Sequence, residues 1–420
     1  MIKLDAGDIA ELGDRAEQMI AELGAISAEP DRLVRLFLTP EHRQAADVVA
    51  GWMRAAGMTP SEDALGTVRG HWPGRAGPAA RCLLIGSHID TVLDAGRYDG
   101  IFGVVAGILA VERVARAGLA LPGAIDVLAF GDEEGSRFPS TLSSSAAVAG
   151  CFDRAALALT DGRGVTFADA LVAYGKSPAD ISAAAYRGDA VAAYVEVHIE
   201  QGPVLEEAGQ PLGIVTGIVG HCRMRAVVTG QAGHAGTVPM RLRRDALAAA
   251  MDFGLRLESI ARENMADAMV ATVGRLDVFP GSANVIPGCV AFSVDLRSMT
   301  DEGRRAAWAD FSAEARRIAA ARGVDVRFEP LLEVAATPCA SGLQETFATA
   351  LADLGCAPIR LPSGAGHDAQ MMARLCPAAM LFVRCRGGVS HNPAEFASPA
   401  DMGLAVAALI RFIERFAASR

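Results

Sequence analysis

The fold is decided by residues 81–109, which read RCLLIGSHIDTVLDAGRYDGIFGVVAGIL. Residues 81–88 form a short apolar run of the kind seen in a strand that is buried on both faces. The next segment predicts a helix, because its apolar residues recur three or four positions apart: Ile101, Val104, Val105, Ile108 and Leu109. Gly103 and Gly107 would let that helix pack closely against a neighbouring element. A buried strand followed by such a helix is a building unit of α/β sheets.

The same pattern extends in both directions along the chain. Further buried-strand runs occupy residues 125–130, 192–198 and 378–384. The first 60 residues predict helices, and Thr39-Pro40 supplies the N-cap and first position of one of them. Residues 66–78 are rich in glycine and proline and predict a loop. Because strands alternate with helical sequence, we expect a parallel sheet in an α/β domain.

A different pattern begins at about residue 213. Strand, helix, strand, strand, helix and strand follow one another, which is the order of a ferredoxin-like unit. Thr300 predicts the N-cap of the second of these helices. We therefore expect a catalytic α/β domain formed by residues 1–212 and 333–420, interrupted by an inserted α+β domain at residues 213–332.

Composition narrows the possible functions. A chain of 420 residues, 51% of them hydrophobic, is too long for one ordinary core, which agrees with two domains. The formal net charge is −10, and no basic run could follow a nucleic-acid backbone. No stretch approaches the roughly 18 apolar residues that a membrane span needs. The acidic first residues are unlike a signal peptide, and eight scattered cysteines without C-x-x-C predict free thiols, so we expect a cytoplasmic protein.

Histidine and aspartate residues follow the strand at residues 81–88, and strand ends are where ligands gather in open α/β sheets. His88 and Asp90 share one face of an extended segment, so Asp90 could orient His88 as a metal ligand. A simple turn at the end of the strand would explain the same pair. Asp99 directly precedes the next helix, where it could be either an N-cap or a ligand.

Further acidic and histidine residues follow the other buried strands. Residues 132–134 are Asp-Glu-Glu, and such adjacent carboxylates repel one another unless solvent or cations neutralise them. Alternation in residues 196–200 places Glu, His and Glu on one side of a strand, and His391 follows the last strand. Together these groups would hold two divalent cations about 3.5–4 Å apart. Nitrogen and oxygen ligands without thiolate suit Zn²⁺, with Mn²⁺ or Co²⁺ as alternatives.

Motifs of several other enzyme classes are absent from the sequence. It contains no G-x-S-x-G elbow, no phosphate-binding loop and no H-E-x-x-H helix. Residues 198–200 match half of a zinc deaminase signature, but no P-C-x-x-C follows them.

Seven segments between about residues 81 and 397 resemble one enzyme family. In chain order they are GSHIDTVLDAGRYDGIFGVVAG, GDEEGSRFPSTL, VEVHIEQGPVLE, AGHAGTVPM, ANVIPGCVAFSVDLRS, SGAGHDAQ and VSHNPAE. The chain thereby resembles the dinuclear amidases that include N-carbamoyl-L-amino-acid hydrolases, β-ureidopropionases and allantoate amidohydrolases, a branch of the aminoacylase and carboxypeptidase metallohydrolases. The resemblance implies a metallopeptidase-like α/β catalytic domain interrupted by an inserted ferredoxin-like dimerisation or lid domain. It also implies two metal ions, usually zinc or manganese, and a homodimer that forms through the inserted domain.

The resemblance also implies roles for single residues. It gives two sets of metal ligands that share a bridging Asp99: His88, Asp99 and His198 for one ion, and Asp99, Glu134 and His391 for the other. Glu133 becomes the general base, and Asp90 becomes the partner that orients His88.

The resemblance implies a substrate pocket as well. His234 would stabilise the oxyanion in the neighbouring subunit's site, Arg297 and Asn284 would bind a substrate carboxylate, and Gln201 and the Gly366 backbone would complete the pocket. An arginine fork suits a carboxylate. From the residues alone, Arg297 could equally be an exposed strand-end charge, and His234 could occupy a tight turn. His367 is left between a supporting and a purely structural role, and His221 lies in no motif.

A histidine at position 198, where the peptidase branch has a carboxylate, favours a small ureido substrate that carries a carboxylate. The segments AGRYDG and DEEGSRFPSTL most resemble the allantoate amidohydrolases of purine catabolism. An N-carbamoyl-L-amino-acid hydrolase or a β-ureidopropionase is the alternative. A non-catalytic binding protein on this scaffold is disfavoured by the intact Glu133, and an aminoacylase or peptidase is disfavoured by His198.

Overall fold

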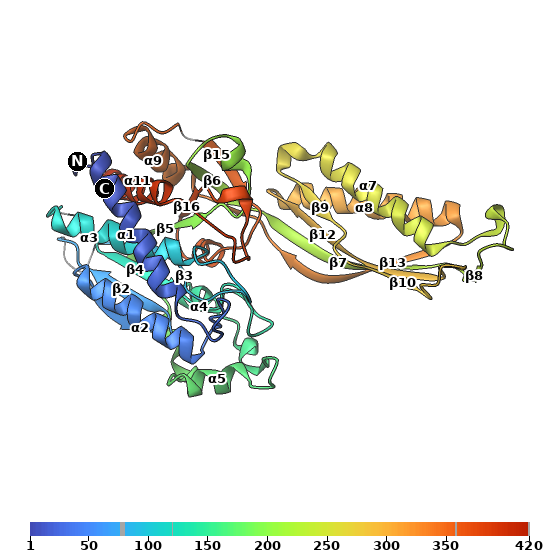
Figure 1. Ribbon diagram of the computed structural model, residues 1–420, viewed down its shortest axis with the longest axis horizontal. Helices are drawn as coiled ribbons and strands as arrows, with labels where there is room; N and C mark the ends of the chain where they lie inside the picture. The colour runs from blue at the N-terminus through green and yellow to red at the C-terminus, as the bar shows by residue number, and fades with distance from the viewer. Residues whose placement is uncertain (76–79, 120, 358, 419–420) are drawn as a thin grey trace. The chain divides into compact units, whose positions relative to one another are not determined.

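The computed structural model describes residues 1–75, 80–119, 121–357 and 359–418. The chain divides into two compact units (Figure 1). Unit 1 comprises Met1–Thr216 and Cys339–Arg420, and unit 2 comprises Gly217–Pro338. Among the described residues, no helix is long and apolar enough to cross a membrane.

Unit 1 is built on one large mixed sheet. Its strands are β1 (Thr59–Glu62), β2 (Val68–Trp72), β3 (Cys82–His88), β4 (Ile125–Phe130), β5 (Val191–Ile199), β6 (Leu212–Ile218), β15 (Ile359–Ser363) and β16 (Ala378–Val383), and β14 (Thr337–Pro338) joins the sheet at its far edge. The order is β1-β2-β4-β3-β5-β16-β6-β14, with β15 also paired to β6. The central strands β4, β3, β5 and β16 are parallel. β3, β4, β5 and β16 are almost entirely buried, which explains their continuous apolar sequences.

The expectation of an all-parallel sheet is wrong at both margins. β1 and β2 form an antiparallel hairpin that pairs antiparallel with β4, and β6 runs antiparallel to β16. β2 lies inside residues 66–78, where the sequence predicts a loop. Only two of the five residues of β2 are buried. A strand near the edge of the sheet therefore lacks the continuous apolar sequence of the central strands.

The helices of unit 1 are α1 (Ala6–Gly24), α2 (Pro40–Ala55), α3 (Ile101–Arg116), α4 (Ser143–Val148), α5 (Phe167–Ala173), α6 (Val204–Glu207), α9 (Ser341–Ala352), α10 (Ala369–Met372) and α11 (Pro399–Ala418). α3 packs on β3, β4 and β5, and α11 packs on α1, α3 and α9. The predicted Thr39 cap is confirmed, because its side chain accepts a hydrogen bond from the backbone of His42. α3 is buried along nearly its whole length, so it forms the centre of the core rather than a surface helix.

Gly103 brings α3 into close contact with two strands. A Cβ at this position would lie 2.2 Å from the carbonyl oxygen of Val197 and 2.7 Å from the Cβ of Ser87. The predicted close approach at this glycine is therefore confirmed.

We expect Gly103→Ala to lower the free energy of unfolding by about 1–3 kcal/mol, because backbone atoms must move to admit the methyl group. Gly51→Ala is the matched control, since Gly51 also lies inside a helix but has nothing within 4 Å of its added Cβ. The free energy of unfolding of the Gly51→Ala control should rise by about 0.5–1 kcal/mol. Urea denaturation measures both values, and equal midpoints for the two variants would contradict the close contact.

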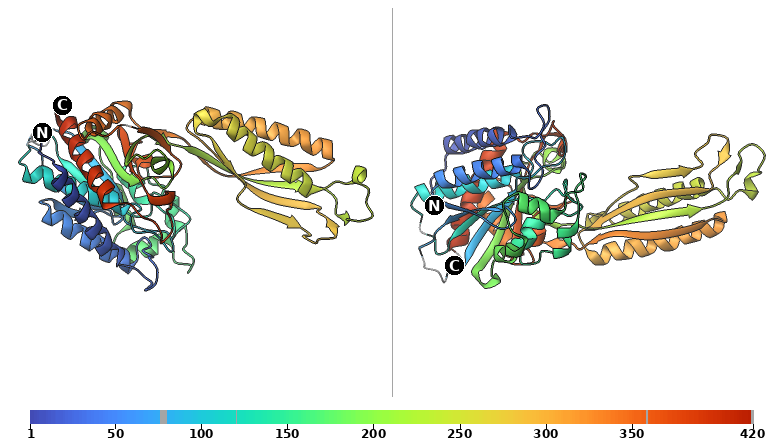
Figure 2. Two further views of the ribbon diagram at one scale, coloured as in Figure 1. Left: turned by 45° about the horizontal axis from the view of Figure 1, so that its top comes forward. Right: turned by 90° about the horizontal axis from the view of Figure 1, so that it is seen from below.

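Unit 2 contains a second sheet and two long helices. Its elements are β7 (Gly220–Thr229), β8 (Gly233–His234), α7 (Ala246–Glu263), β9 (Val270–Thr272), β10 (Leu276–Phe279), β11 (Val285–Ile286), β12 (Cys289–Ser298), α8 (Asp301–Arg322) and β13 (Asp325–Val334). The sheet order is β10-β12-β7-β13, with β9 also on β12, and all of these pairings are antiparallel. α7 and α8 lie side by side on one face of this sheet (Figure 2). The predicted Thr300 cap of α8 is confirmed.

The limits of the insertion differ from the expected residues 213 and 332. β6 pairs with β16 of unit 1 through Leu212–Ile214, so residues 213–216 belong to the larger sheet. At the other end, β13 continues its pairing with β7 as far as Val334. Strand pairing, which the local sequence does not reveal, sets both limits.

Candidate metal centre

The candidate site lies where the central parallel strands of unit 1 end. His88 is the last residue of β3, and His198 is the second-last residue of β5. Residues 131–134 follow β4, and His391 follows β16 after a short connection. Because β4, β3, β5 and β16 are neighbours and parallel, their carboxyl ends meet at one edge of the sheet.

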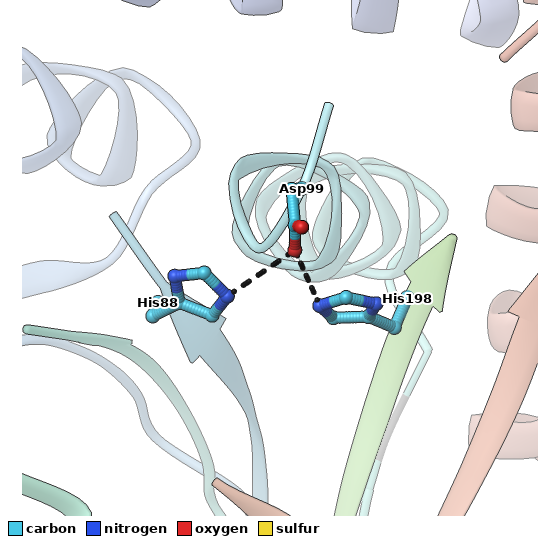
Figure 3. A group of neighbouring side chains, drawn as sticks. All are labelled: His88, Asp99 and His198. Atoms are coloured by element: carbon cyan, nitrogen blue, oxygen red, sulfur yellow. Dashed lines mark ion pairs between the residues drawn. The ribbon is translucent and has the colours of Figure 1, made fainter. Parts of the chain in front are cut away.

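Asp99 lies between two imidazoles (Figure 3). Its Oδ1 is 3.5 Å from Nε2 of His88 and 3.1 Å from Nε2 of His198, and all three residues are buried. Nδ1 of His88 lies 3.1 Å from the carbonyl oxygen of Asp90, and Nδ1 of His198 lies 2.8 Å from that of Ile199. Donation from Nδ1 leaves a lone pair on each Nε2 that is directed at the site.

Asp99 does not cap the following helix, so the N-cap interpretation is wrong. The N-cap of α3 is Gly100, with φ +67° and no side-chain cap hydrogen bond. A Cβ at Gly100 would lie 2.4 Å from the His88 ring, so a glycine is needed for the chain to turn here. This turn leaves the Asp99 carboxylate free to face the imidazoles.

The other oxygen of Asp99 belongs to a second group. Asp99 Oδ2 lies 3.3 Å from Nε2 of His391, which in turn lies 3.5 Å from Oε2 of Glu134. Glu133 Oε2 lies 3.9 Å from Nε2 of His88. Among the described residues, both expected ligand sets form groups whose donor atoms lie within 4.8 Å of one another.

Asp90 links the acidic loop that follows β4 to His88. Its carboxylate accepts hydrogen bonds from the backbone N–H groups of Glu133 and Glu134, at 3.2 Å each. The same carboxylate lies 3.4 Å from Nδ1 of His88. Asp90 therefore holds both the acidic loop and the imidazole in position.

The electrostatics of this cluster show an excess of buried negative charge. Burial and the neighbouring Asp99 raise the pKa of Glu134 to about 7, and burial raises the pKa of Glu133 well above its ordinary value. Hydrogen bonding to Asp99 raises the pKa of His391 to about 9 despite burial. These carboxylates repel one another, and their raised pKa values show that binding protons would relieve the repulsion. Divalent cations would relieve the same repulsion and stabilise the cluster.

The residues present fit divalent metal ions. The donors are imidazole nitrogens and carboxylate oxygens, which suit Zn²⁺ and related ions. His198 Nε2 is buried and makes no hydrogen bond, although Asp99 Oδ1 lies 3.1 Å away, and such an unpaired atom is costly unless another group binds its lone pair. Its lone pair is directed into the site, as expected of a ligand.

A family model described as peptidase family M20/M25/M40 matches residues 84–415, which include every candidate ligand. The chain belongs to this family. Two curated relatives are similar in sequence to nearly the whole chain. An N-carbamoyl-L-amino acid amidohydrolase of Geobacillus stearothermophilus is 41% identical over 96% of this chain and 98% of that protein. An allantoate deiminase of Arabidopsis thaliana is 39% identical over 96% of this chain and 82% of that protein.

Solved structures agree with this placement in the M20/M25/M40 family. A hydantoinase/carbamoylase family amidase from Burkholderia ambifaria has a TM-score of 0.89 and 37% identity, over 99% of this chain and 98% of that chain. An aminopeptidase PepT from Bacillus cereus, at 16% identity and a TM-score of 0.64, shares the fold.

Two of the expected pocket residues, Gln201 and Gly366, lie beside the candidate metal ligands. Gln201 donates a hydrogen bond from Nε2 to Asp99 Oδ2, at 2.8 Å, from a left-handed backbone with φ +57°. A Cβ at Gly366 would lie 3.9 Å from Glu133 Oε1, which places this glycine against the expected general base. His367 packs edge-on against His198, with ring centroids 4.5 Å apart, and lies 2.7 Å from Ser363 Oγ.

The other expected pocket residues lie in unit 2, where Arg297 belongs to the five-stranded sheet and His234 belongs to a separate two-stranded sheet formed by β8 and β11. Asn284 directly precedes β11, whose Val285 pairs with His234 of β8. Arg297 is near the end of β12, opposite His221, where Asp295 holds its guanidinium with bonds of 2.8 and 3.0 Å. Asn284 is therefore not part of β12, the strand that carries Arg297. Eight residues of β12 separate Cys289 from Arg297, or about 26 Å at about 3.3 Å per residue.

The sequence interpretation missed several buried polar residues near the site. Glu196 accepts hydrogen bonds from Ser87 and Tyr194 behind the ligands, and Asp368 is fully buried. Glu395 lies beside Asp99 and accepts a hydrogen bond from its backbone N–H. His42 is also buried, and burial lowers its pKa to about 4. Glu196, Asp368 and Glu395 all lie within the family segments quoted above, which is the signal that could have singled them out.

Proposed function

We propose that this protein is a dinuclear metal-dependent amidohydrolase that cleaves a ureido C–N bond, with allantoate as its substrate. The observation that carries the proposal is the group of three imidazoles and two carboxylates centred on Asp99, with Glu133 beside it. Relatives named for allantoate and for N-carbamoyl amino acids, each at 35–41% identity over nearly the whole chain, support a ureido substrate.

His88, Asp99 and His198 would hold one ion, and Asp99, Glu134 and His391 would hold the other. When bound, the pair of ions would lower the pKa of a water molecule towards neutrality. Zn²⁺, Mn²⁺ and Co²⁺ each suit this donor set. Asp90 would keep His88 in the tautomer that presents Nε2 to the site.

Glu133 is the proposed general base. It is largely buried and belongs to neither of the two proposed ligand sets, although its carboxylate also forms a group with His88 and Glu134. Its carboxylate would accept a proton as the water oxygen bonds to the carbamoyl carbon. The same proton would pass to the leaving nitrogen as the C–N bond breaks, and the released carbamate would decompose to CO₂ and ammonia.

Unit 2 is proposed to be a ferredoxin-like lid and dimerisation domain. Its β-α-β-β-α-β order and antiparallel sheet support that description. Arg297 and Asn284 would bind the substrate carboxylate, and His234 would stabilise the oxyanion. About 26 Å of strand separates Arg297 from the end of β12 that is nearest to His234. One copy of unit 2 therefore cannot bring both side chains to the same small substrate molecule. We therefore assign His234 and Asn284 to the site of a neighbouring subunit.

Exposed apolar side chains on unit 2 support association between two copies. Met251 and Leu255 on α7 are 57% and 68% exposed, and Val270 on β9 is 53% exposed. A groove lined by the end of α7 and by β9 lies next to them. Large apolar side chains grouped on one element are typical of a protein interface.

Substrate choice can be tested by the release of ammonia from a panel of ureido acids. We expect the highest kcat/KM with allantoate, and lower values with N-carbamoyl-β-alanine and N-carbamoyl-L-amino acids. All of these substrates present a ureido group near a carboxylate, so Arg297→Lys should raise KM for every one of them. A higher kcat/KM with N-carbamoyl-L-amino acids would instead establish the carbamoylase alternative, and no turnover of any ureido acid would refute the proposed class.

A further inference from the structure

Glu395 is a buried carboxylate beside the candidate centre for which the proposed reaction has no use. It lies in the loop at residues 390–395 and is 5% exposed. Its Oε1 accepts hydrogen bonds from the backbone N–H groups of Tyr98, at 2.8 Å, and Asp99, at 3.0 Å. Its Oε2 lies 2.8 Å from Ser390 Oγ. Each contact thus reaches a candidate ligand or a residue adjacent to one.

The segment before Asp99 is shaped around this carboxylate. A Cβ at Gly96 would lie 2.3–2.4 Å from three atoms of the Glu395 side chain, including Oε1. Only a glycine at this position lets the carboxylate reach the backbone of Tyr98 and Asp99. The loop that carries Asp99 therefore depends on Glu395 for its backbone hydrogen bonds.

The loop that carries His391 is joined to the same carboxylate. His391 has a left-handed φ of +53°, and the turn is closed by hydrogen bonds from Glu395 N to Asn392 O, at 3.0 Å, and from Ala394 N to Asn392 Oδ1, at 2.9 Å. Ser390 Oγ lies 2.9 Å from Asp99 Oδ2 as well as close to Glu395. His391 and Glu395 therefore belong to one closed turn, and Glu395 connects this turn to the segment of Asp99.

We propose that Glu395 is a positioning residue that fixes Asp99 relative to His391, and thereby determines how tightly the ion of the Asp99, Glu134 and His391 set is bound. This inference rests on the proposed metal centre but not on the proposed substrate. The other set should be far less affected, because His88 and His198 are held by strands β3 and β5. Charge-assisted hydrogen bonds to a buried carboxylate are strong, and their loss leaves two backbone donors unpaired.

A metal titration tests the proposal. Metal-free protein is titrated with Mn²⁺, bound ions are counted, and electron paramagnetic resonance separates single from paired Mn²⁺. Glu395→Ala is expected to weaken binding of the second ion about 10–100-fold, as loss of groups that support ligands generally does, while the first ion stays within about threefold. Glu395→Gln should bind both ions within about threefold of the unaltered protein, because its amide oxygen still accepts from Tyr98 and Asp99.

Asp63→Ala is the matched control. Asp63 also accepts two backbone N–H groups, from Leu65 and Thr67, but it lies between β1 and β2 and supports no candidate ligand. It should lose stability and keep both ions.

Paired Mn²⁺ in Glu395→Ala with unchanged affinity would overturn the proposal. So would equal weakening of both ions, loss of the second ion in Asp63→Ala, or binding of only one Mn²⁺ by the unaltered protein. If the second ion is lost as expected but no ureido acid is hydrolysed, the role of Glu395 stands and the proposed function fails.

Discussion

Replacing Glu133 by glutamine is expected to lower kcat about 10²–10⁴-fold while both metal ions stay bound. The factor is the usual contribution of a positioned general acid and base. Glutamine has the same shape as glutamate but cannot accept the proton of the attacking water. Glu133 forms a group with His88 and Glu134 but belongs to neither proposed ligand set, so if the proposed sets are right, both ions should stay bound in the variant.

Ammonia release measures the turnover of Glu133→Gln, and elemental analysis measures its metal content. Glu134→Gln is the matched control, because it changes the adjacent carboxylate, which lies 3.5 Å from His391 Nε2. The control should lose the second ion as well as activity. Turnover of Glu133→Gln within tenfold of the unaltered protein, with its metals present, would show that another group is the base.

Leu255→Asp is expected to produce monomers that bind metal but have lost nearly all activity. Leu255 is 68% exposed on α7, so aspartate costs the folded subunit little. In a dimer interface the buried and unpaired charge would be strongly unfavourable. If His234 acts in the neighbouring subunit, a monomer lacks its oxyanion donor, and loss of one such donor alone costs about 10²–10³ in kcat.

Sedimentation analysis gives the oligomeric state of Leu255→Asp, and metal content and ammonia release complete the test. Val172→Asp is the control, since Val172 is an equally exposed apolar residue, 60% exposed, on α5 of unit 1. It should remain dimeric and active. A fully active Leu255→Asp monomer would contradict the assignment of His234 to a neighbouring subunit.

The parallel centre of the large sheet could be predicted because burial on both faces leaves a clear mark on the sequence. β4 matches the expected residues 125–130, β3 begins one residue later than expected, and β5 is one residue longer than expected at each end. The marginal strand β2 could not be predicted in the same way. Its pairing with β4 is a long-range contact, and its own residues show only weak apolar alternation.

The candidate ligands could be proposed because they follow predicted strands and match family segments. Asp99 shows the limit of local interpretation, since an aspartate before a helix usually serves as its cap. Only the turn at Gly100, which the His88 ring requires, directs the carboxylate to the imidazoles instead. Glu395 ends the family segment VSHNPAE, but its role could not be predicted, because it accepts hydrogen bonds from the backbone of residues nearly 300 positions away.

The sequence by itself determined the α/β class, the presence of an insertion and the residue types of a metal centre. Each of these depends on local periodicity or on residues present in the chain. The tertiary structure decided which carboxylate bridges the imidazoles, where the insertion begins and ends, and that His234 and Arg297 belong to two different sheets of unit 2. These outcomes depend on strand order, register and turns that bring distant residues together, and no local pattern in the chain encodes such pairings.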